Sequence, residues 1–263
     1  MNVFTFSEFE ILLFFAALVR VSMFFLLLPF FGDNNVPGTV KILLPFALTL
    51  MLFPILKTGA ISVRPEDLQS SLGIVIVVFK EASVGLAMGF IAKMFFDALS
   101  FGFAFVGMQM GFTMASMYDH HTESNMPVIS QVIMIFATLI FLGIDGHHML
   151  IRAMVESFRV IPIGGAVFTK AISGFVMNAA VQVFWIAVKL SAPMALVIFL
   201  ANTAFGIIAK AVPQINVLVV SFSVNVLVGF FVLFLTLPVF GTNVGAVFQE
   251  MFVRMTDVLR YLT

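Results

Sequence analysis

The histidines are the residues best suited to chemistry in this sequence, and all four lie in two short polar stretches. The stretches read Asp119-His120-His121-Thr122-Glu123 and Asp145-Gly146-His147-His148. Imidazole and carboxylate groups are suitable ligands for zinc, iron or manganese. One hypothesis is therefore a polytopic transporter of metal ions or small solutes, with its site built from Asp119, His120, His121, Glu123, Asp145, His147 and His148.

The spacing of these histidines is poor for a metal site. Neighbouring side chains on a helix point about 100° apart, so an adjacent pair presents two ligands to one ion badly. Neither stretch has the i, i+4 spacing that places two ligands on one helix face. The competing interpretation is that the polar residues end helices at an aqueous boundary, with Asp119 and Asp145 as caps.

Motifs for other chemistry are missing from the sequence. It contains no His-Glu-x-x-His, no Gly-x-Ser-x-Gly and no glycine-rich phosphate loop. It has no cysteine, which excludes disulfides, thiolate metal sites and cysteine nucleophiles. Thirteen basic and thirteen acidic residues give a formal net charge of zero, unlike the basic surface of a nucleic-acid binder. We expect no enzymatic activity, no cofactor and no nucleic-acid partner.

A methionine-rich segment is the most unusual feature of the chain. Residues 107–118 read Gly-Met-Gln-Met-Gly-Phe-Thr-Met-Ala-Ser-Met-Tyr and hold four of the 17 methionines. Methionine side chains are unbranched and repack easily around different neighbours. A cluster of this kind suits a deformable seal, because hydrophobic constrictions close pores by excluding water. The alternative is an ordinary methionine-rich helix core.

The composition shows which elements must position these residues. Hydrophobic residues make up 62% of the chain and charged residues 10%, against about 45–50% and about 25% in soluble domains. Most of the outer surface must therefore face lipid or other subunits. Stretches without Asp, Glu, Lys or Arg cover residues 98–118, 124–144, 171–188, 190–209 and 211–249, and three further apolar regions cover 11–31, 41–57 and 68–97.

These apolar stretches predict an all-α, membrane-associated protein with six to eight long helices. A helix that crosses a bilayer needs about 20 residues, and backbone groups in apolar surroundings must pair within the segment. Turn-forming residues predict breaks at 32–38, 57–67, 119–127 and 161–165, near Pro213, and at 238–245. The acidic start of the chain, without a cleavage site, is expected to be retained. Basic residues occur in nearly all the connections, so some helices are expected not to cross the bilayer.

A stripe of small and charged residues marks one helix face. Its members recur every four residues and therefore lie next to one another on a helix: Glu81, Gly85, Gly89, Lys93 and Asp97. Glycines let a second backbone approach closely. Charges beside such a seam must be paired with each other or across an interface, because isolated charges there are very unfavourable.

Polar amides within the apolar stretches point to contacts with protein rather than lipid. The sequence places Asn178 and Gln182 four residues apart, and Ser221 and Asn225 likewise, so each pair shares a helix face. Packing within the chain and contact with another subunit are both open. The residues predicted for helix packing or a subunit interface are the stripe together with Asn178, Gln182, Gln214, Asn216 and Asn225.

Five motifs in order resemble the FliR/SctT family of type III export-gate proteins over nearly the whole chain. They are Gly107-Met108-Gln109-Met110-Gly111-Phe112, Asn125-Met126-Pro127-Val128, Gly146-His147 before an apolar helix, Pro162-Ile163-Gly164-Gly165, and Pro213-Gln214-Ile215-Asn216 before an apolar run. The chain departs from the family where it has Asp119-His120 in place of Asp-Pro, and Asp145-Gly146-His147 in place of Asn-Gly-His. The closeness of the motifs favours the flagellar branch.

The resemblance implies a single subunit, residues 1–263, built from helical hairpins, with a FliP-like part over about 1–190 and a FliQ-like part over 191–263. It implies one copy joined to several copies of FliP and FliQ, with FlhB and other export-apparatus proteins nearby, in the basal body at the bacterial inner membrane and partly above the bilayer plane. The complex would conduct unfolded flagellar proteins. The plug that closes its channel would comprise Gly107, Met108, Gln109, Met110, Gly111, Phe112, Met114 and Met117.

Overall fold

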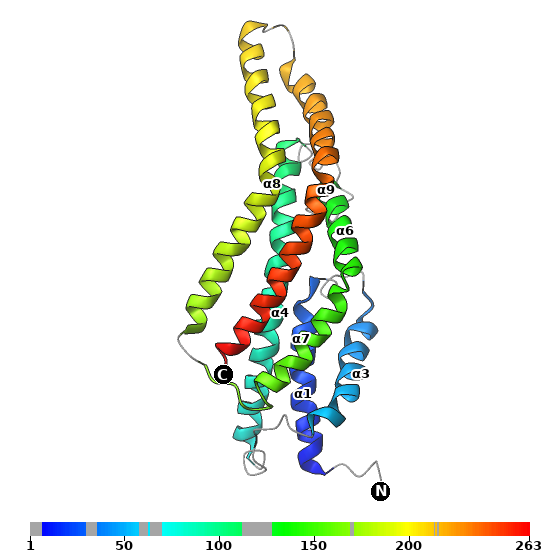
Figure 1. The fold of residues 1–263 in the computed structure, drawn as a ribbon, viewed down its shortest axis with the longest axis vertical. Coiled ribbons are helices and arrows are strands. Elements are labelled where there is room, and N and C mark those ends of the chain that lie inside the picture. Colours follow the sequence, from blue (N-terminus) through cyan, green and yellow to red (C-terminus); the bar gives the residue numbers. More distant parts are fainter. Residues whose placement is uncertain are drawn as a thin grey trace. The chain divides into compact units, whose positions relative to one another are not determined.

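The computed structural model of the chain is made of helices (Figure 1). It describes residues 7–29, 36–57, 63, 70–111, 128–168, 171–212, 214 and 216–263. Within these ranges there are seven helices and no strand: α1 (Glu8–Leu27), α3 (Gly38–Leu56), α4 (Ser71–Gln109), α6 (Val128–Gly143), α7 (Gly146–Val160), α8 (Ala171–Ala211) and α9 (Val217–Arg260). The prediction of an all-α protein built from long apolar helices is confirmed for this part of the chain.

Five of the described helices are long and apolar enough to cross a membrane, namely α1, α3, α4, α8 and α9. A sixth span results if α6 and α7 count as one broken span. The predicted break at 238–245 is wrong, because α9 continues through Pro238. Proline removes one backbone hydrogen bond, but ending the helix in apolar surroundings would leave many more groups unpaired.

The chain divides into two compact units, each assembled from segments far apart in sequence. Unit 1 contains Met1–Met94, His147–Ala180 and Glu250–Thr263, and unit 2 contains Phe95–Gly146 and Val181–Gln249. Helices α4, α8 and α9 each contribute residues to both units. The division of the chain near residue 190 into FliP-like and FliQ-like parts stays a prediction.

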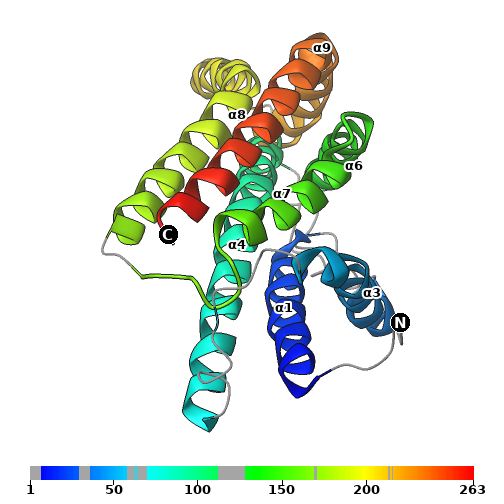
Figure 2. The ribbon, with the colours of Figure 1, turned by 60° about the horizontal axis from the view of Figure 1, so that its bottom comes forward.

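In unit 1, α1 and α3 lie side by side (Figure 2). The ring of Phe14 packs edge to face on Phe46 and Phe53, with centroids 5.7 and 5.4 Å apart. The Nζ of Lys57 lies 2.7 Å from Glu10, so the end of α3 is tied to the start of α1. Ser7 and Glu10 form a capping box at that start, which pairs backbone N–H groups that the helix leaves free.

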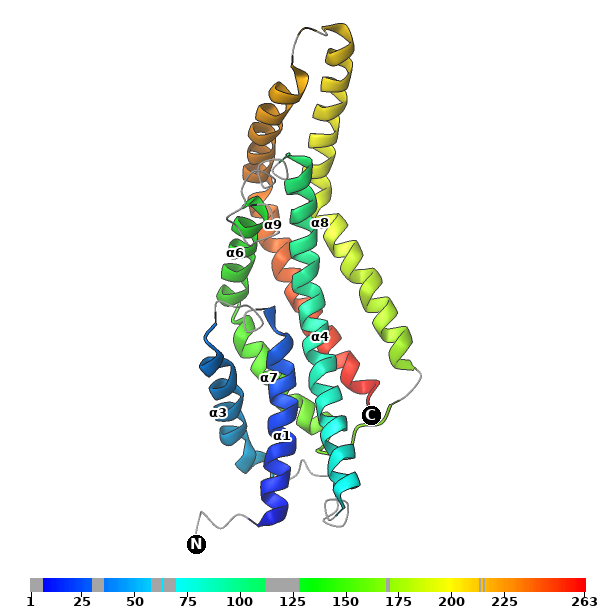
Figure 3. The same ribbon diagram turned by 180° about the vertical axis from the view of Figure 1, so that it is seen from behind.

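The other side of α1 packs on the first half of α4, and two glycines make the contact (Figure 3). A Cβ added at Gly85 would collide with the carbonyl oxygen of Arg20. One added at Gly89 would lie 2.8 Å from the carbonyl oxygen of Phe24. The two backbones therefore touch at these positions, and only glycine leaves the space that this requires.

Unit 2 has its own aromatic core. Phe96, Phe141 and Phe248 are each 1% exposed or less and contact one another, with centroids 4.9 to 5.4 Å apart. Residues 181–211 of α8 and 217–249 of α9 form a hairpin in this unit (Figures 1 and 3). Many of its apolar side chains are exposed, such as Phe199, Phe231 and Phe234. This unit thus presents a large apolar surface of the kind that lipid or another subunit covers.

The Gly85 contact yields a test of the α1–α4 seam. Gly85→Ala should destabilise the chain by about 1–3 kcal/mol, because the new methyl group meets backbone that cannot rotate away. Gly174→Ala on α8 is the control, since nothing lies within 4 Å of its added Cβ; alanine there should be neutral or slightly stabilising. Thermal unfolding of the purified chain in mild detergent measures both, and equal midpoints would show that the seam is looser than described.

Candidate functional site

A buried ion pair joins α1 to α4 in unit 1. The Nε of Arg20 lies 2.7 Å from Oε2 of Glu81, and the Nη2 of Arg20 lies 3.0 Å from Oε1. Both side chains are 0% exposed. The pairing is bidentate, the geometry in which guanidinium and carboxylate bind most strongly. Arg20 sits beside the Gly85 contact, so the close approach of the helices also brings the two charges together.

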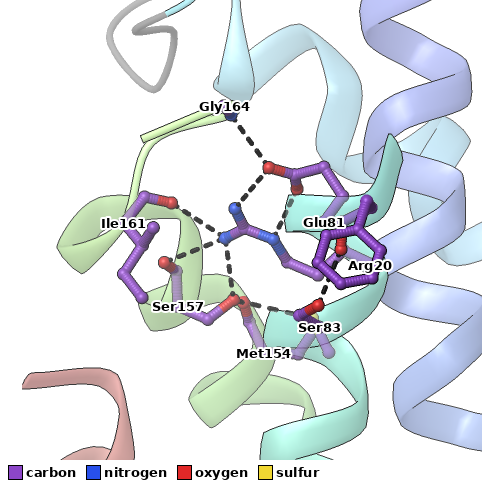
Figure 4. Close-up of polar contacts among 8 residues, drawn as sticks. Arg20, Glu81, Ser83, Met154, Ser157, Ile161 and Gly164 are labelled. Carbon is purple, nitrogen blue, oxygen red and sulfur yellow. Dashed lines mark hydrogen bonds and ion pairs between the residues drawn. The ribbon is translucent and has the colours of Figure 1, made fainter. Parts of the chain in front are cut away.

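Arg20 also binds the end of α7 (Figure 4). Its Nη1 donates hydrogen bonds to the carbonyl oxygens of Ser157 and Ile161, at 3.1 and 2.8 Å. Carbonyls at a helix C-terminus lack partners within the helix and carry partial negative charge, so a cation there is stabilising. The guanidinium also lies over the ring of Phe158, 4.2 Å from its centroid.

Glu81 and its neighbour hold the turn that follows α7. Oε1 of Glu81 accepts a hydrogen bond of 2.9 Å from the backbone N–H of Gly164, and Nζ of Lys80 donates one of 3.1 Å to the Gly164 carbonyl. Gly164 has φ +79°, and an added Cβ would collide with Val63. The Pro162-Ile163-Gly164-Gly165 motif is thus a turn that needs glycine and is fixed by α4.

This arrangement can position elements but offers no reactive group. The charges of Arg20 and Glu81 are satisfied by each other and by backbone groups, which is the condition for burying an ion pair. Sequence reasoning placed Glu81 on the stripe and missed Arg20 as its partner. The available signal was that Arg20 is the one charged residue in the apolar stretch 11–31.

The predicted plug begins at the end of α4 in unit 2. Gly107 and Met110 are buried, Met108 is 54% exposed, and Gln109 and Gly111 are partly buried. Gly111 has φ +89° and lies two residues after Gln109, the last residue of α4. Phe112, Met114 and Met117 lie outside the described residues. The structure thus covers the first part of the plug segment, where the helix ends.

The other predicted packing residues have varied surroundings. Asn225 on α9 is buried, and its Nδ2 donates a 2.6 Å hydrogen bond to Oδ1 of Asn202 on α8. Oε1 of Gln182 is buried and has no hydrogen-bond partner among the described residues. The remaining residues are exposed or partly buried, and they are Lys93, Asp97, Asn178, Gln214 and Asn216. The carbonyl of Asn216 accepts hydrogen bonds from the first turn of α9.

The second histidine stretch spans the start of α7, with Asp145 in the turn before the helix and His147 and His148 in its first turn. Asp145, His147 and His148 are exposed, and one ligand atom from each lies within 4.8 Å of the others. Asp145 has φ 57° and α7 begins at Gly146, in agreement with the expectation that these residues occupy a helix end. Asp119, His120, His121 and Glu123 lie outside the described residues.

Because the Arg20–Glu81 pair is buried, replacing Arg20 should destabilise the chain far more than replacing the exposed Arg159. Arg20→Met and Glu81→Gln each leave a buried charge without its partner, so each should cost about 3–5 kcal/mol of stability. Arg159→Gln is the control, because the Arg159–Glu156 pair lies on the surface and such pairs contribute little. Thermal unfolding in detergent, with the yield of folded chain, measures the effect. If all three variants unfold alike, the Arg20–Glu81 pair does not hold α1, α4 and α7 together.

Comparison with known proteins identifies the family. The family model described as "Bacterial export proteins, family 1" matches residues 11–251. The chain is 32% identical over 244 residues to the flagellar biosynthetic protein FliR of Bacillus subtilis, covering 92% of both chains. It is 26% identical over 250 residues to FliR of Escherichia coli, covering 95% of this chain and 94% of that protein.

FliR of Aquifex aeolicus is a further relative, 26% identical over 233 residues, covering 89% of this chain and 88% of its own. These relatives are flagellar biosynthetic proteins by name, and they lend no support to the metal-transporter alternative. The match runs through all seven described helices and both compact units. The chain belongs to family 1 of the bacterial export proteins.

Proposed function

We propose that this chain is a structural and gating subunit of the flagellar type III protein export channel. The observation that carries the proposal is the match to a FliR protein over 92% of the chain, together with a family match over residues 11–251 that includes the methionine-rich segment at the end of α4. The subunit has no catalytic role. It conducts unfolded flagellar proteins as part of a complex, and the energy for export comes from other components.

The partners are several copies each of FliP and FliQ around one copy of this chain, with FlhB and other export-apparatus proteins in contact with the complex. The exposed apolar surfaces of α8 and α9 support this proposal. In the most apolar 18-residue stretch of each helix, only 28% of the residues of α8 and 17% of those of α9 are buried within the chain. Such surfaces need lipid or protein to cover them. The complex lies in the inner membrane within the flagellar basal body, and part of it stands above the bilayer plane.

The plug residues close the channel by a passive mechanism. Methionine and phenylalanine side chains exclude water from a narrow pore and repack when a chain passes. Among the plug residues, Met108, whose side chain is exposed, forms the seal together with Phe112, Met114 and Met117. Export substrates displace it, and no bond is made or broken.

The composition of the complex is the first prediction of this proposal. Native mass spectrometry of the tagged chain, co-expressed with its genomic neighbours and purified in mild detergent, should show a large hetero-oligomer with one copy of this chain. The expectation follows from the apolar surface that the chain leaves uncovered. A monomer, or a homo-oligomer that carries a metal ion, would contradict it.

The seal is tested separately by a deletion of residues 112–117, which spares the buried Met110 and the described end of α4. The complex should assemble in normal amounts and leak ions, because the constriction that excludes water is lost. Ion flux through the complex in liposomes measures the leak. The intact complex is the reference, since a deletion of the same length at 240–245 lies within α9 and is unsuitable as a control. Normal assembly with unchanged ion flux would exclude the plug assignment.

A further inference from the structure

Met110, the residue that follows α4, packs against α9. Met110 is 0% exposed. A Cβ added at Gly229 would collide with the Cε of Met110 and lie 2.6 Å from its Sδ and 2.9 Å from its Cγ. The Met110 side chain therefore occupies the space that any side chain at residue 229 would need. Glycine at residue 229 leaves this space free for Met110.

A second contact on α9 adjoins the first. A Cβ added at Gly111 would lie 2.8 Å from a ring carbon of Phe222. Residues 222 and 229 are seven apart, about two helical turns, so they share one face of α9. The backbone N–H of Gly111 donates to the carbonyl of Met108 at 3.0 Å, and its φ of +89° ends the helix. Met110 and Gly111, the two residues after α4, therefore both contact this face of α9.

The two methionines before this point have opposite surroundings. Met108 is 54% exposed, whereas Met110 is fully buried. Residues two apart on a helix point about 200° apart, so the two side chains leave α4 on different sides. One side of the helix end is therefore bound to α9 and the other is open. Met110 is thus packed inside the chain against Gly229, whereas the side chain of Met108 lies on the surface of the chain.

We propose that Met110, seated on Gly229, anchors the gate end of α4 to α9 and keeps the closed gate in place. This inference rests on the proposed gating function and deepens it, because it assigns different roles to two methionines. Met110 anchors the helix end, and Met108 belongs to the seal. Met110 is a positioning residue, because its side chain is fully buried and packs on Gly229. The tightness of the closed gate then depends on the fit between residues 110 and 229.

A size-exchange experiment on the assembled complex tests the anchor. Gly229→Ala displaces the end of the Met110 side chain, and Met110→Ala leaves the space beside residue 229 empty. Each should raise ion flux through the complex in liposomes about tenfold, equivalent to about 1.4 kcal/mol in the closing equilibrium. The double variant Met110→Ala/Gly229→Ala should return flux toward that of the unmodified complex, because the added methyl group occupies part of the vacated space.

Two other glycines of unit 2 serve as matched controls. Gly241 is also on α9, with nothing within 4 Å of its added Cβ, so Gly241→Ala should leave flux unchanged. Gly102 lies earlier on α4, and its added Cβ would be 2.8 Å from the carbonyl oxygen of Ala187 on α8. Gly102→Ala should therefore lower stability and yield while the complexes that assemble remain closed. A purely structural role for Met110 predicts that Gly102→Ala and Gly229→Ala behave alike.

The outcomes separate the anchor from the proposed function. If the complex with residues 112–117 deleted leaks ions but the Gly229→Ala complex has the same ion flux as the Gly241→Ala complex, the anchoring role of Met110 is wrong and the proposed gating function is unaffected. If neither leaks in assembled complexes, the gating function itself is wrong. If Gly229→Ala prevents assembly, the double variant decides: recovery of a closed complex supports the size match, and no recovery overturns it.

Discussion

The Arg20–Glu81 ion pair is the interaction on which unit 1 depends. Both charges are completely buried, which is tolerable only because each finds a charged partner and backbone groups at hydrogen-bond distance. Those backbone groups belong to the end of α7 and the turn after it. One buried pair therefore holds three helices and a glycine turn in a single arrangement, in a chain whose apolar side chains could pack in many ways.

Close helix contact at glycine, with a backbone or a side chain, is the second recurring constraint. Gly85 and Gly89 allow α1 to touch α4 in unit 1, while Gly102 and Gly229 allow α4 to touch α8 and α9 in unit 2. In apolar surroundings the hydrophobic effect drives helix association weakly, so contact area and fit decide which faces meet. The glycines give α4 partners over both units and place the helix end that carries Met108 and Met110.

The proposed gate therefore combines a rigid support with a deformable segment. Buried groups such as Arg20, Glu81 and Met110 have fixed partners within the chain. The exposed methionine of the same helix end has no such fixed seat, and its soft side chain suits repacking around a passing polypeptide. A seal that yields to a substrate works only if the helix that carries it stays in place.

The sequence by itself determined the all-helical architecture, because long apolar stretches leave the backbone no other way to pair its polar groups. It also marked Gly85, Gly89 and the 107–111 segment as close-packing or unusual positions, since small residues and methionines are recognisable by type alone. The tertiary structure decided which partners they meet. Arg20 as the partner of Glu81 and Gly229 as the seat of Met110 lie 61 and 119 residues away, and no local periodicity relates residues at such separations. The continuity of α9 through Pro238 was also a tertiary outcome, because the cost of one lost hydrogen bond must be weighed against the surroundings of the whole helix.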